Sequence, residues 1–330
     1  MSELAQGGVR TVDFRAEMSQ TAEMVRANFY PTDHHWNGDA SFRAFQRLAR
    51  EIGEVACTAE EREQIERSVL CKKSWVRVER SGVLLGSSGR RCGPCFGGVD
   101  PVVYYVPQFP TDIAFSVPKR INGTPGLKRT GDFLQSVMDL GKLEVTNGLM
   151  SSDAYCVHIG GSYPLGLSVN RQAPVRKRIL MVVDSFARPV QAYFSALFTE
   201  VDAIDLRYYQ DGSLMNYIKR RNPDVVLYLY NTKTLNDKVL TVGVADGKYS
   251  VCYHRNRNAA DDEQQVLQYA CGKAKCLAWA ESELGWKRGK MKIVGWDVSP
   301  AAKTVIYKNG QRVSDLAAPD ATVDLYAVWQ

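Results

Sequence analysis

The feature that most restricts the fold is an alternation of strand and helix patterns between residues 177 and 231. The strand patterns are "KRILMVVDS" (177–185), "EVDAIDLRYY" (200–209) and "PDVVLYLYN" (223–231). The stretches between them, 186–198 and 213–221, are typical of helices, and Pro189 falls in a first turn, where proline is tolerated. Such repeats form parallel sheets with right-handed crossovers. We therefore expect an α/β fold with a flavodoxin-like parallel sheet.

Ser185 stands where the first of these strands ends and a helix begins. Open α/β sheets place their sites at that edge, and a helix N-terminus offers backbone N–H groups to a developing oxyanion. Serine is a weak nucleophile unless a histidine takes its proton and a carboxylate orients that histidine. Ser185 is therefore a candidate nucleophile, and the alternative is that it only caps the helix.

Two of the four histidines are adjacent in "YPTDHHWNGD" (30–39). In an extended stretch, residues i and i+2 project to the same side. Asp33 and His35 could therefore lie together as a base with its orienting carboxylate, with His34 facing away. Two alternatives remain. His34 and His35 could be hydrogen-bonded loop residues with no catalytic role, or they could belong to a metal site, for which no third ligand is obvious.

The charge, the apolar runs and the cysteine pattern argue against several classes of protein. A net charge of +6 without a long basic stripe does not indicate nucleic-acid binding. The longest apolar runs have strand length, so we expect no membrane span, and the first ten residues lack the apolar stretch of a secretion signal. "CGPC" (92–95) looks like a redox motif, but we expect a Gly-rich loop there with no helix to follow, holding free thiols or a loop disulfide. We expect no cofactor and no metal ion.

A longer stretch, "FYPTDHHWNGDASFRAF", closely resembles the signature of the DHHW family. These bacterial proteins are similar to alginate O-acetyltransferases within the SGNH hydrolase-like group. "VRTVDFRAEM", "YVPQFPTD", "DAYCVHIGGSYPLGLSVN" and the strand–helix repeat also look like family segments, so the resemblance covers about residues 9–236. It implies an SGNH-like fold with Ser185 as nucleophile, His35 as base and Asp33 as its orienter. His34 fills the variable position between them.

The oxyanion donors are expected from the Ser185 N–H and a neighbouring loop. "HIGGSYP" offers Gly160 and Gly161, where the backbone can approach a ligand closely, and the alternative is that these glycines only make a turn. Asn231, which ends its strand, is a third candidate for the same edge. Trp36 is expected to be a packing anchor.

The C-terminal part resembles a different family, the internalin B-type (Listeria–Bacteroides) repeat. The resemblance rests on Gly285–Trp286, Gly295–Trp296, Tyr307 to Gly310, Leu325–Tyr326–Ala327 and Trp329, with "KYSVCYHRN" (248–256) as a first strand. Such repeats form small β-grasp-like modules on bacterial surface proteins. The resemblance implies a β-rich module presented outside the cell, in which spaced aromatics such as Trp296 and Trp329 fill the core. We also expect one helix near 262–270.

Together these observations predict two domains, an SGNH/DHHW-like catalytic-type domain at 1–244 and a repeat module at 245–330. DHHW proteins usually begin with an anchor or signal and a first α/β portion, so we expect the first domain to be N-terminally shortened. The expected function is acyl, in particular O-acetyl, transfer to a bacterial cell-surface or exopolysaccharide glycan. The alternatives are an esterase with the same triad and an inactive surface or interaction protein. The expected partners are an acyl donor, a glycan acceptor and surface or envelope proteins, and the expected location is the cell surface or outside the cell.

Overall fold

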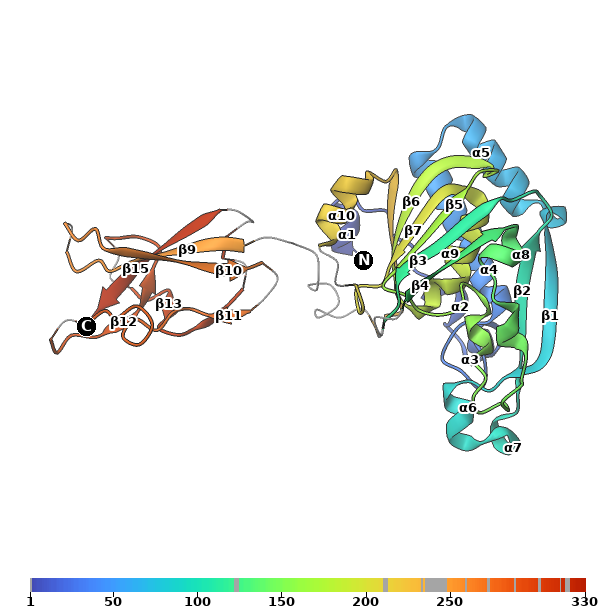
Figure 1. Ribbon diagram of the computed structural model, residues 1–330, viewed down its shortest axis with the longest axis horizontal. Helices are drawn as coiled ribbons and strands as arrows, with labels where there is room; N and C mark the ends of the chain where they lie inside the picture. Colours follow the sequence, from blue (N-terminus) through green and yellow to red (C-terminus); the bar gives the residue numbers. More distant parts are fainter. Residues whose placement is uncertain are drawn as a thin grey trace. The chain divides into compact units, whose positions relative to one another are not determined.

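The computed structural model describes residues 2–121, 125–209, 213–232, 234, 248–258, 260–271, 274–287, 289–301, 304–314, 316–317 and 321–330. The chain forms two compact units (Figure 1). One comprises Met1–Tyr209 and Asn222–Asn236, and the other Gln210–Arg221 and Asp237–Gln330. The predicted domain boundary between residues 244 and 245 lies outside the described residues. Within the described part, every helix is too short or too polar to cross a bilayer.

The first unit contains helices and strands in an order that begins helical and then alternates. Its helices are α1 (Ser2–Gln6), α2 (Arg15–Met18), α3 (Ala22–Asn28), α4 (Gly38–Ala56), α5 (Ala59–Ile65), α6 (Ser87–Cys92), α7 (Pro94–Gly97), α8 (Phe133–Ser136) and α9 (Arg188–Leu197), with short helices η1 (Glu66–Leu70), η2 (Lys72–Ser74), η3 (Leu140–Leu143), η4 (Ala154–Val157) and η5 (Ser185–Ala187). Its strands are β1 (Trp75–Leu84), β2 (Asp100–Pro107), β3 (Ile113–Lys119), β4 (Pro125–Gly131), β5 (Leu165–Asn170), β6 (Val175–Val183), β7 (Phe198–Ile204) and β8 (Val225–Leu229).

A six-stranded sheet with the order β4-β3-β5-β7-β6-β8 forms the centre of this unit. β6 is parallel to β7 and to β8, as the strand–helix repeat predicts. β5 is antiparallel to β7, β3 to β5 and β4 to β3, so the sheet is mixed rather than wholly parallel. β1 and β2 form a separate antiparallel pair. The predicted α/β fold class is confirmed, with an antiparallel half added to the parallel core.

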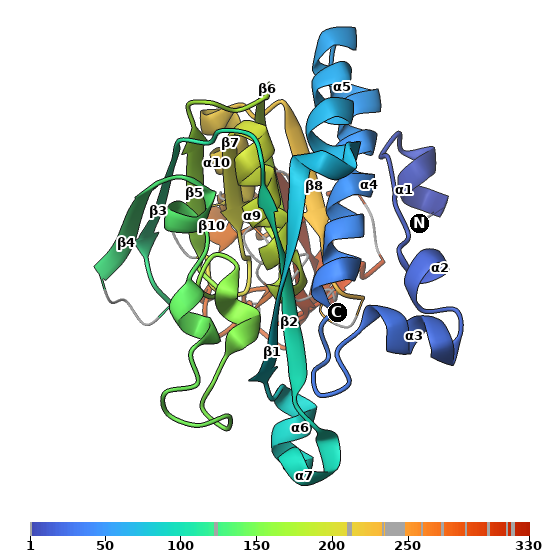
Figure 2. The same cartoon turned by 90° about the vertical axis from the view of Figure 1, so that its right-hand side faces the viewer.

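The longest helix, α4, begins directly after the histidine loop. The Asn37 side chain caps it by accepting a hydrogen bond from the Ala40 N–H. A Cβ on Gly38 would lie 1.9 Å from the Val103 carbonyl oxygen, so only glycine allows this helix start to approach β2 so closely. The apolar residues that repeat along α4 are buried, and the helix packs against α9 (Figure 2). This contact fixes the end of the histidine loop relative to the sheet.

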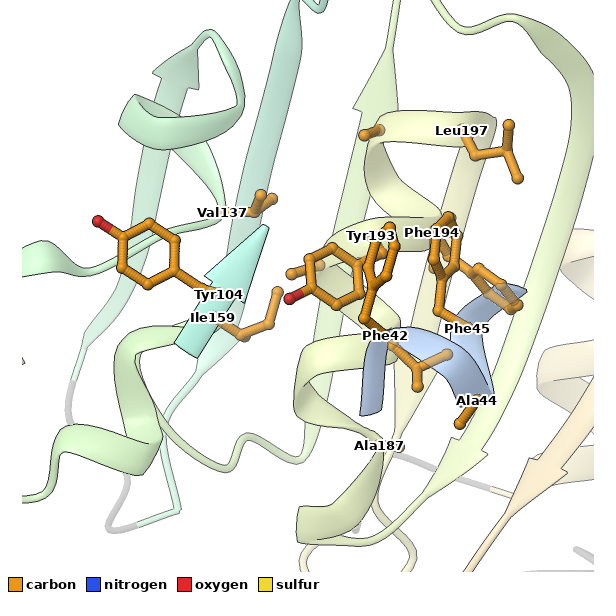
Figure 3. Close-up of a cluster of buried hydrophobic side chains, with 14 of the residues drawn as sticks. Phe42, Ala44, Phe45, Tyr104, Val137, Ile159, Ala187, Tyr193, Phe194 and Leu197 are labelled. Carbon is orange, nitrogen blue, oxygen red and sulfur yellow. The ribbon is translucent and has the colours of Figure 1, made fainter. Parts of the chain in front are cut away.

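Aromatic side chains fill the core between α4 and α9 (Figure 3). Phe42 and Phe45 of α4 meet Tyr193 of α9 with ring centroids 5.3 Å apart in each pair. Phe45 also meets Phe194, at 5.8 Å. Large rings bury much apolar surface, and edge-to-face contacts add to that stabilisation. α9, which follows Ser185, is therefore held rigidly at its buried face.

Two local predictions for the first unit are wrong. With two β-branched residues, residues 10–14 ("RTVDF") are expected to form a short strand, but they form none, and the neighbouring α2 begins at Arg15. The "CGPC" segment was expected to be loop, but Cys92 ends α6 and Pro94 begins α7. Gly93 between them has φ +81°, which only glycine adopts without strain, so the glycine joins two short helices.

The second unit contains the helix α10 (Leu214–Arg221) and is otherwise β-rich, as predicted. Its strands are β9 (Lys248–His254), β10 (Gln264–Ala270), β11 (Lys275–Cys276), β12 (Ile293–Asp297), β13 (Tyr307–Lys308), β14 (Arg312–Val313) and β15 (Thr322–Trp329). Five of them form a sheet with the order β10-β9-β15-β12-β13, and β11 pairs with β14. The helix predicted near 262–270 is wrong because Gln265, Leu267 and Tyr269 alternate with more exposed residues at the period of a strand.

Aromatic residues build the core of the second unit. Trp296 is fully buried, and its ring lies 4.7 Å from that of Tyr253 and 6.2 Å from that of Trp286. Trp329 is only half-buried, packs against the edge of this core and donates its indole N–H to the Arg255 carbonyl. The predicted burial is thus confirmed for Trp296. Trp329 is only partly buried and packs against this core without being part of it.

Candidate active site

The histidine loop is a closed turn rather than an extended stretch. Phe29 and Trp36 pair across it in an antiparallel bridge, and the Tyr30 N–H donates to the His35 carbonyl. Its tip is anchored by Thr32, which donates both its backbone N–H and its hydroxyl to the buried carboxylate of Asp100. These bonds hold residues 30–36 against the first residue of β2.

A second anchor comes from the residues that begin α6. Gly86 lies so close to the loop that an added Cβ would be 2.2 Å from the Asp33 Cβ. The next residue, Ser87, donates both its N–H and its hydroxyl to Asp33 Oδ1, at 3.2 and 2.9 Å. The Asp33 side chain is therefore oriented by a segment more than fifty residues further along the chain.

Ser185 lies at the C-terminal end of β6, at the edge of the sheet where the sequence predicted it. Asp184 precedes it, and its carboxylate accepts the Phe186 N–H at 2.9 Å and the Asn231 N–H at 2.8 Å. Asp184 therefore caps the short helix η5 and joins the end of β6 to the end of β8. Ser185 itself does not supply this cap, which leaves its hydroxyl available for another partner.

That partner is His35. Its Nε2 lies 2.8 Å from Ser185 Oγ, and its Nδ1 lies 2.9 Å from Asp33 Oδ2. An ionised carboxylate can only accept, so Nδ1 carries the imidazole proton and Nε2 is the acceptor for the serine hydroxyl. The three side chains predicted as a triad thus form one hydrogen-bonded chain from Asp33 through His35 to Ser185.

The electrostatics of the site favour a neutral histidine beside an ionised aspartate. Burial lowers the pKa of His35 below its ordinary value, and the neighbouring charges of His34 and Arg188 lower it further, although Asp33 acts in the opposite direction. Burial acts to raise the pKa of Asp33, but the hydrogen bonds from His35, Ser87 and the His34 N–H outweigh it and hold that pKa well below its usual range. At neutral pH the pair is therefore ready to accept a proton from Ser185.

His34 does not face away from the site, contrary to the sequence-based expectation. Its ring lies 3.9 Å from the ring of His35, and its Nδ1 lies 3.0 Å from both Ser87 Oγ and Asp33 Oδ1. The expectation assumed an extended backbone, whereas the turn brings both histidines to one side of Asp33. The His34 side chain remains 57% exposed, so it forms the solvent-facing cover of the pair.

Sequence reasoning missed Tyr155, which packs directly on the triad, and Arg188, which packs on Tyr155. The ring of Tyr155 stacks on His35 at 3.8 Å, and its hydroxyl donates to the Ser185 carbonyl at 3.1 Å. The guanidinium group of Arg188 lies over the Tyr155 ring, with its Cζ 5.6 Å from the ring centroid. Tyr155 belongs to "DAYCVHIGG", where no spacing pattern distinguishes it, and only the family-like character of that segment pointed to it.

Trp36 is the packing anchor that the sequence predicted. It is buried, and its ring lies 5.7 Å from Phe186 and 6.0 Å from Phe14. Phe186 also lies 4.9 Å from His35. The residues that follow the histidine and the serine in the sequence therefore pack on one another, which fixes the separation of the two loops.

The predicted oxyanion residues differ in what their backbone groups do. The Gly160 N–H donates to the Cys156 carbonyl, and the Asn231 N–H donates to Asp184. Asn231 does lie at the predicted sheet edge, next to the residue that precedes Ser185. Gly161 lines a small hollow together with Asp184 and Arg188. The lining of this hollow includes neither Ser185 nor His35, so the oxyanion roles of Gly161 and of the Ser185 N–H stay predictions.

The side-chain atoms of Asp33, His34 and His35 lie within 4.8 Å of one another, so they are also candidates to hold a metal ion. In this arrangement both Asp33 oxygens and both His35 nitrogens already have hydrogen-bond partners within the site. A metal would have to displace these bonds. The geometry is therefore that of a base with its orienting carboxylate.

The fold and the site together form an α/β unit with a Ser-His-Asp arrangement at the edge of its sheet. Residues 1–101 match the family model described as "SGNH hydrolase-like domain, acetyltransferase AlgX". No curated protein matches the chain.

One solved structure has a similar fold. PatB1 of Bacillus cereus superposes with a TM-score of 0.51 at 20% identity, covering 69% of this chain and 70% of that one. PatB1 with a sulfonyl adduct gives 0.48 at 20% identity, covering 66% and 64%. A DHHW family protein from Eubacterium siraeum DSM 15702 gives 0.41 at 17% identity, covering 63% and 61%. This chain therefore spans between 61% and 70% of these three chains.

Proposed function

We propose that this protein transfers an acyl group, in particular acetyl, to a glycan of the bacterial cell envelope, through a covalent acyl-enzyme on Ser185. The observation that carries the proposal is the hydrogen-bonded chain from Asp33 through His35 to Ser185 at the end of β6. The match of residues 1–101 to an acetyltransferase family model supports acyl transfer as the reaction class.

In the first half-reaction, Ser185 Oγ attacks the carbonyl carbon of the acyl donor while His35 Nε2 takes the hydroxyl proton. Asp33 stabilises the imidazolium that forms, because its carboxylate lies 2.9 Å from Nδ1. The bond from the carbonyl carbon to the leaving oxygen then breaks, and His35 returns the proton to that oxygen. The Ser185 and Gly161 N–H groups are the proposed oxyanion donors.

In the second half-reaction a sugar hydroxyl attacks the acyl-serine. His35 takes the proton of that hydroxyl, and the departing Ser185 Oγ receives it back. A transferase must hold the acceptor close enough to outcompete water. Residues 70–170 are the proposed source of this acceptor surface, because two parts of this range, Ser87 and Tyr155, contact the triad.

The second unit is proposed to be an internalin B-type repeat module that presents the first unit at the cell surface or outside the cell. Envelope proteins and the glycan are then its proposed partners. This proposal is supported by the aromatic core around Trp296 and by the Gly-Trp and Leu-Tyr-Ala positions of the repeat.

The test measures acyl transfer and hydrolysis in the same reaction. Purified full-length protein is mixed with p-nitrophenyl acetate, with and without an oligosaccharide acceptor, and mass spectrometry locates acetyl groups on Ser185 and on the sugar. We expect slow nitrophenol release in water alone, faster release with acceptor, and acetylated sugar as product. The Ser185→Ala variant should do none of these.

Two results would change the assignment. Rapid hydrolysis that is indifferent to the acceptor would make the protein an esterase with the same triad. A folded chain that forms no acyl-enzyme with any activated ester would make it a non-catalytic surface protein.

A further inference from the structure

A group of potential metal ligands lies on the second unit, on the face of the sheet opposite its aromatic core. β9 runs parallel to β15 and beside it (Figure 1), with Cys252 paired to Asp324 and His254 paired to Tyr326. Paired residues and residues two apart on one strand project to the same face. The sequence thus places a thiol, an imidazole and a carboxylate side by side on two strands that are about seventy residues apart in the chain.

The three side chains are in contact. His254 Nε2 lies 2.8 Å from Asp324 Oδ1, and the ligand atoms of all three residues lie within 4.8 Å of one another. The ring of Tyr326 stacks on His254 at 4.4 Å, which restricts the rotation of the imidazole. The cluster is therefore oriented before any ligand arrives.

Core packing does not explain the thiol. Tyr249, Val251 and Tyr253 alternate with Cys252 along β9 and are fully buried on the other face, where they build the core of the unit. Cys252 is itself only 5% exposed, although it lies on the face that carries the half-exposed Asp324. The His254–Asp324 pair and the buried Cys252 thiol together offer the donor atoms that a soft or borderline metal ion prefers.

We propose that Cys252, His254 and Asp324 bind a divalent transition metal ion of the zinc type. The proposal concerns the second unit alone and does not depend on the activity proposed for the first.

The spacing of the ligand atoms fits such an ion after small side-chain rotations. Zinc binds thiolate sulfur at about 2.3 Å and imidazole or carboxylate atoms at about 2.0–2.2 Å, which places tetrahedral ligand atoms about 3.5 Å apart. The His254 nitrogen and the Asp324 oxygen, now 2.8 Å apart, would have to move apart to reach this spacing. Any pair of ligand atoms near the upper limit of 4.8 Å would have to move closer together. The backbone pairing of β9 with β15 can stay as it is.

A fourth donor lies on the neighbouring strand. Gln264 of β10 pairs with His254, and its Oε1 accepts a hydrogen bond from the Cys252 thiol, with sulfur and oxygen 3.3 Å apart. Once the thiol is deprotonated, this carbonyl oxygen or a water completes four-coordination. Three side chains with one weak or open position form the coordination pattern that zinc adopts when the site is not closed.

The mixture of donors selects the class of metal. Calcium and magnesium take oxygen ligands, so a site with one sulfur and one nitrogen disfavours them. Thiolate and imidazole favour zinc, cobalt, nickel and copper among divalent ions. Binding exchanges the thiol proton for the metal, which forms a Cys252–metal bond and releases that proton to solvent.

The experiment uses Co²⁺ as the probe, because a cobalt–thiolate bond gives a near-ultraviolet charge-transfer band that carboxylates and imidazoles do not give. The parent for this test is the whole 330-residue chain with Cys71→Ser, Cys92→Ser and Cys95→Ser, which removes the exposed thiols of the first unit. Under reducing conditions, Co²⁺ is titrated into this parent and into Cys252→Ser, His254→Gln, Asp324→Asn and Cys276→Ser. Cys276, an exposed thiol of the same unit, is the matched control.

We expect one equivalent of Co²⁺ to bind the parent with a thiolate charge-transfer band that Zn²⁺ abolishes. Cys252→Ser should lose the band, and His254→Gln and Asp324→Asn should weaken binding at least about tenfold. Cys276→Ser should behave as the parent.

The proposal is overturned if the folded parent shows no thiolate band with excess Co²⁺, or if the band survives in Cys252→Ser. Circular dichroism of each variant establishes that it is folded. Asp324→Asn keeps the shape and hydrogen-bonding reach of the carboxylate, so it tests the ligand even where Cys252→Ser disturbs the sheet.

Discussion

His35 Nε2 lies 2.8 Å from Ser185 Oγ, although the two residues are 150 positions apart in the chain. This hydrogen bond joins the proposed base to the proposed nucleophile. It forms because the closed turn of residues 30–36 and the end of β6 are each fixed independently, the first by Thr32 and Ser87 and the second by Asp184.

The first prediction concerns this pair and its orienting carboxylate. Ser185→Ala, His35→Ala and Asp33→Asn should each lower kcat/KM for p-nitrophenyl acetate by roughly 10³-fold or more, because each removes the nucleophile, the base or the tautomer that makes the base effective. Double variants should be little worse than single ones, since the three act as a unit. Steady-state kinetics with the exposed Ser151→Ala as control measures the effect. Additive losses in the double variants would contradict a shared proton-transfer step.

The second prediction concerns His34. Its charge lowers the pKa of His35, so His34→Ala should raise that pKa towards its ordinary value. The base works only when it is neutral, so activity rises with pH through the pKa of His35, and the acid limb of the kcat/KM profile should move to higher pH in the variant. At pH 8, where His35 is neutral in both proteins, the loss should stay below about tenfold.

The measurement is the pH dependence of kcat/KM for the wild type, His34→Ala and His34→Gln. An acid limb that does not move, or that moves to lower pH, would contradict the charge effect. A loss at pH 8 equal to that of His35→Ala would indicate a metal or another arrangement at Asp33, His34 and His35.

The third prediction tests the close approach between Gly86 and the histidine loop. In Gly86→Ala the new Cβ would lie 2.2 Å from the Asp33 Cβ and 2.5 Å from the Thr32 carbonyl oxygen, so the loop must move. We expect kcat/KM to fall about 10²-fold, because displacement of a catalytic group by about 1 Å has effects of that size. The unfolding free energy of the first unit should fall by about 1–3 kcal/mol.

Gly141→Ala is the matched control, since its Cβ would meet its nearest neighbour at 3.5 Å. Chemical denaturation and ester kinetics of both variants separate the two effects. A Gly86→Ala protein with wild-type kinetics would show that the position of Asp33 does not depend on this contact.

The fourth prediction concerns the core of the second unit. Trp296→Ala removes a fully buried ring from between Tyr253 and Trp286 and should destabilise that unit by about 3–5 kcal/mol. Trp279, which is 51% exposed, is the control, and Trp279→Ala should change stability far less. Calorimetry should show one transition shifted by Trp296→Ala, with the esterase kinetics of the first unit unchanged. Loss of that activity would mean that the two units fold as one.

The parallel half of the sheet could be predicted because β6 and β8 are continuous apolar runs of strand length, and helix patterns of ordinary length separate the strands. The antiparallel half could not, because β3 and β5 carry alternating patterns among glycines and prolines, where pairing partners depend on contacts distant in sequence. The prediction of a helix at 262–270 was wrong for the same reason, because the pairing partner lies elsewhere in the sequence. Gln and Leu favour helices locally, but pairing with β9 outweighs that preference.

The site was predictable to the extent that its chemistry resides in a recognisable short pattern. Asp33, His35 and Ser185 met that condition. Ser87 and Tyr155 did not, because a serine after a glycine and a tyrosine in an irregular segment are common, and only the folded chain brings them to Asp33 and His35. The orientation of His34 depended on a turn whose closure comes from Phe29 and Trp36 rather than from the residues between them.

The 150-residue separation of His35 and Ser185 also has a consequence in time. At synthesis rates of about 5–20 residues per second, roughly 8–30 s pass between the emergence of the base and that of its nucleophile. Until Ser87 and Asp100 have emerged, the loop that carries His35 also lacks the groups that anchor it. The proposed acyl-enzyme cannot form before Ser185 is made, so the proposed catalytic competence arises late in the synthesis of each molecule, when β6 joins the sheet.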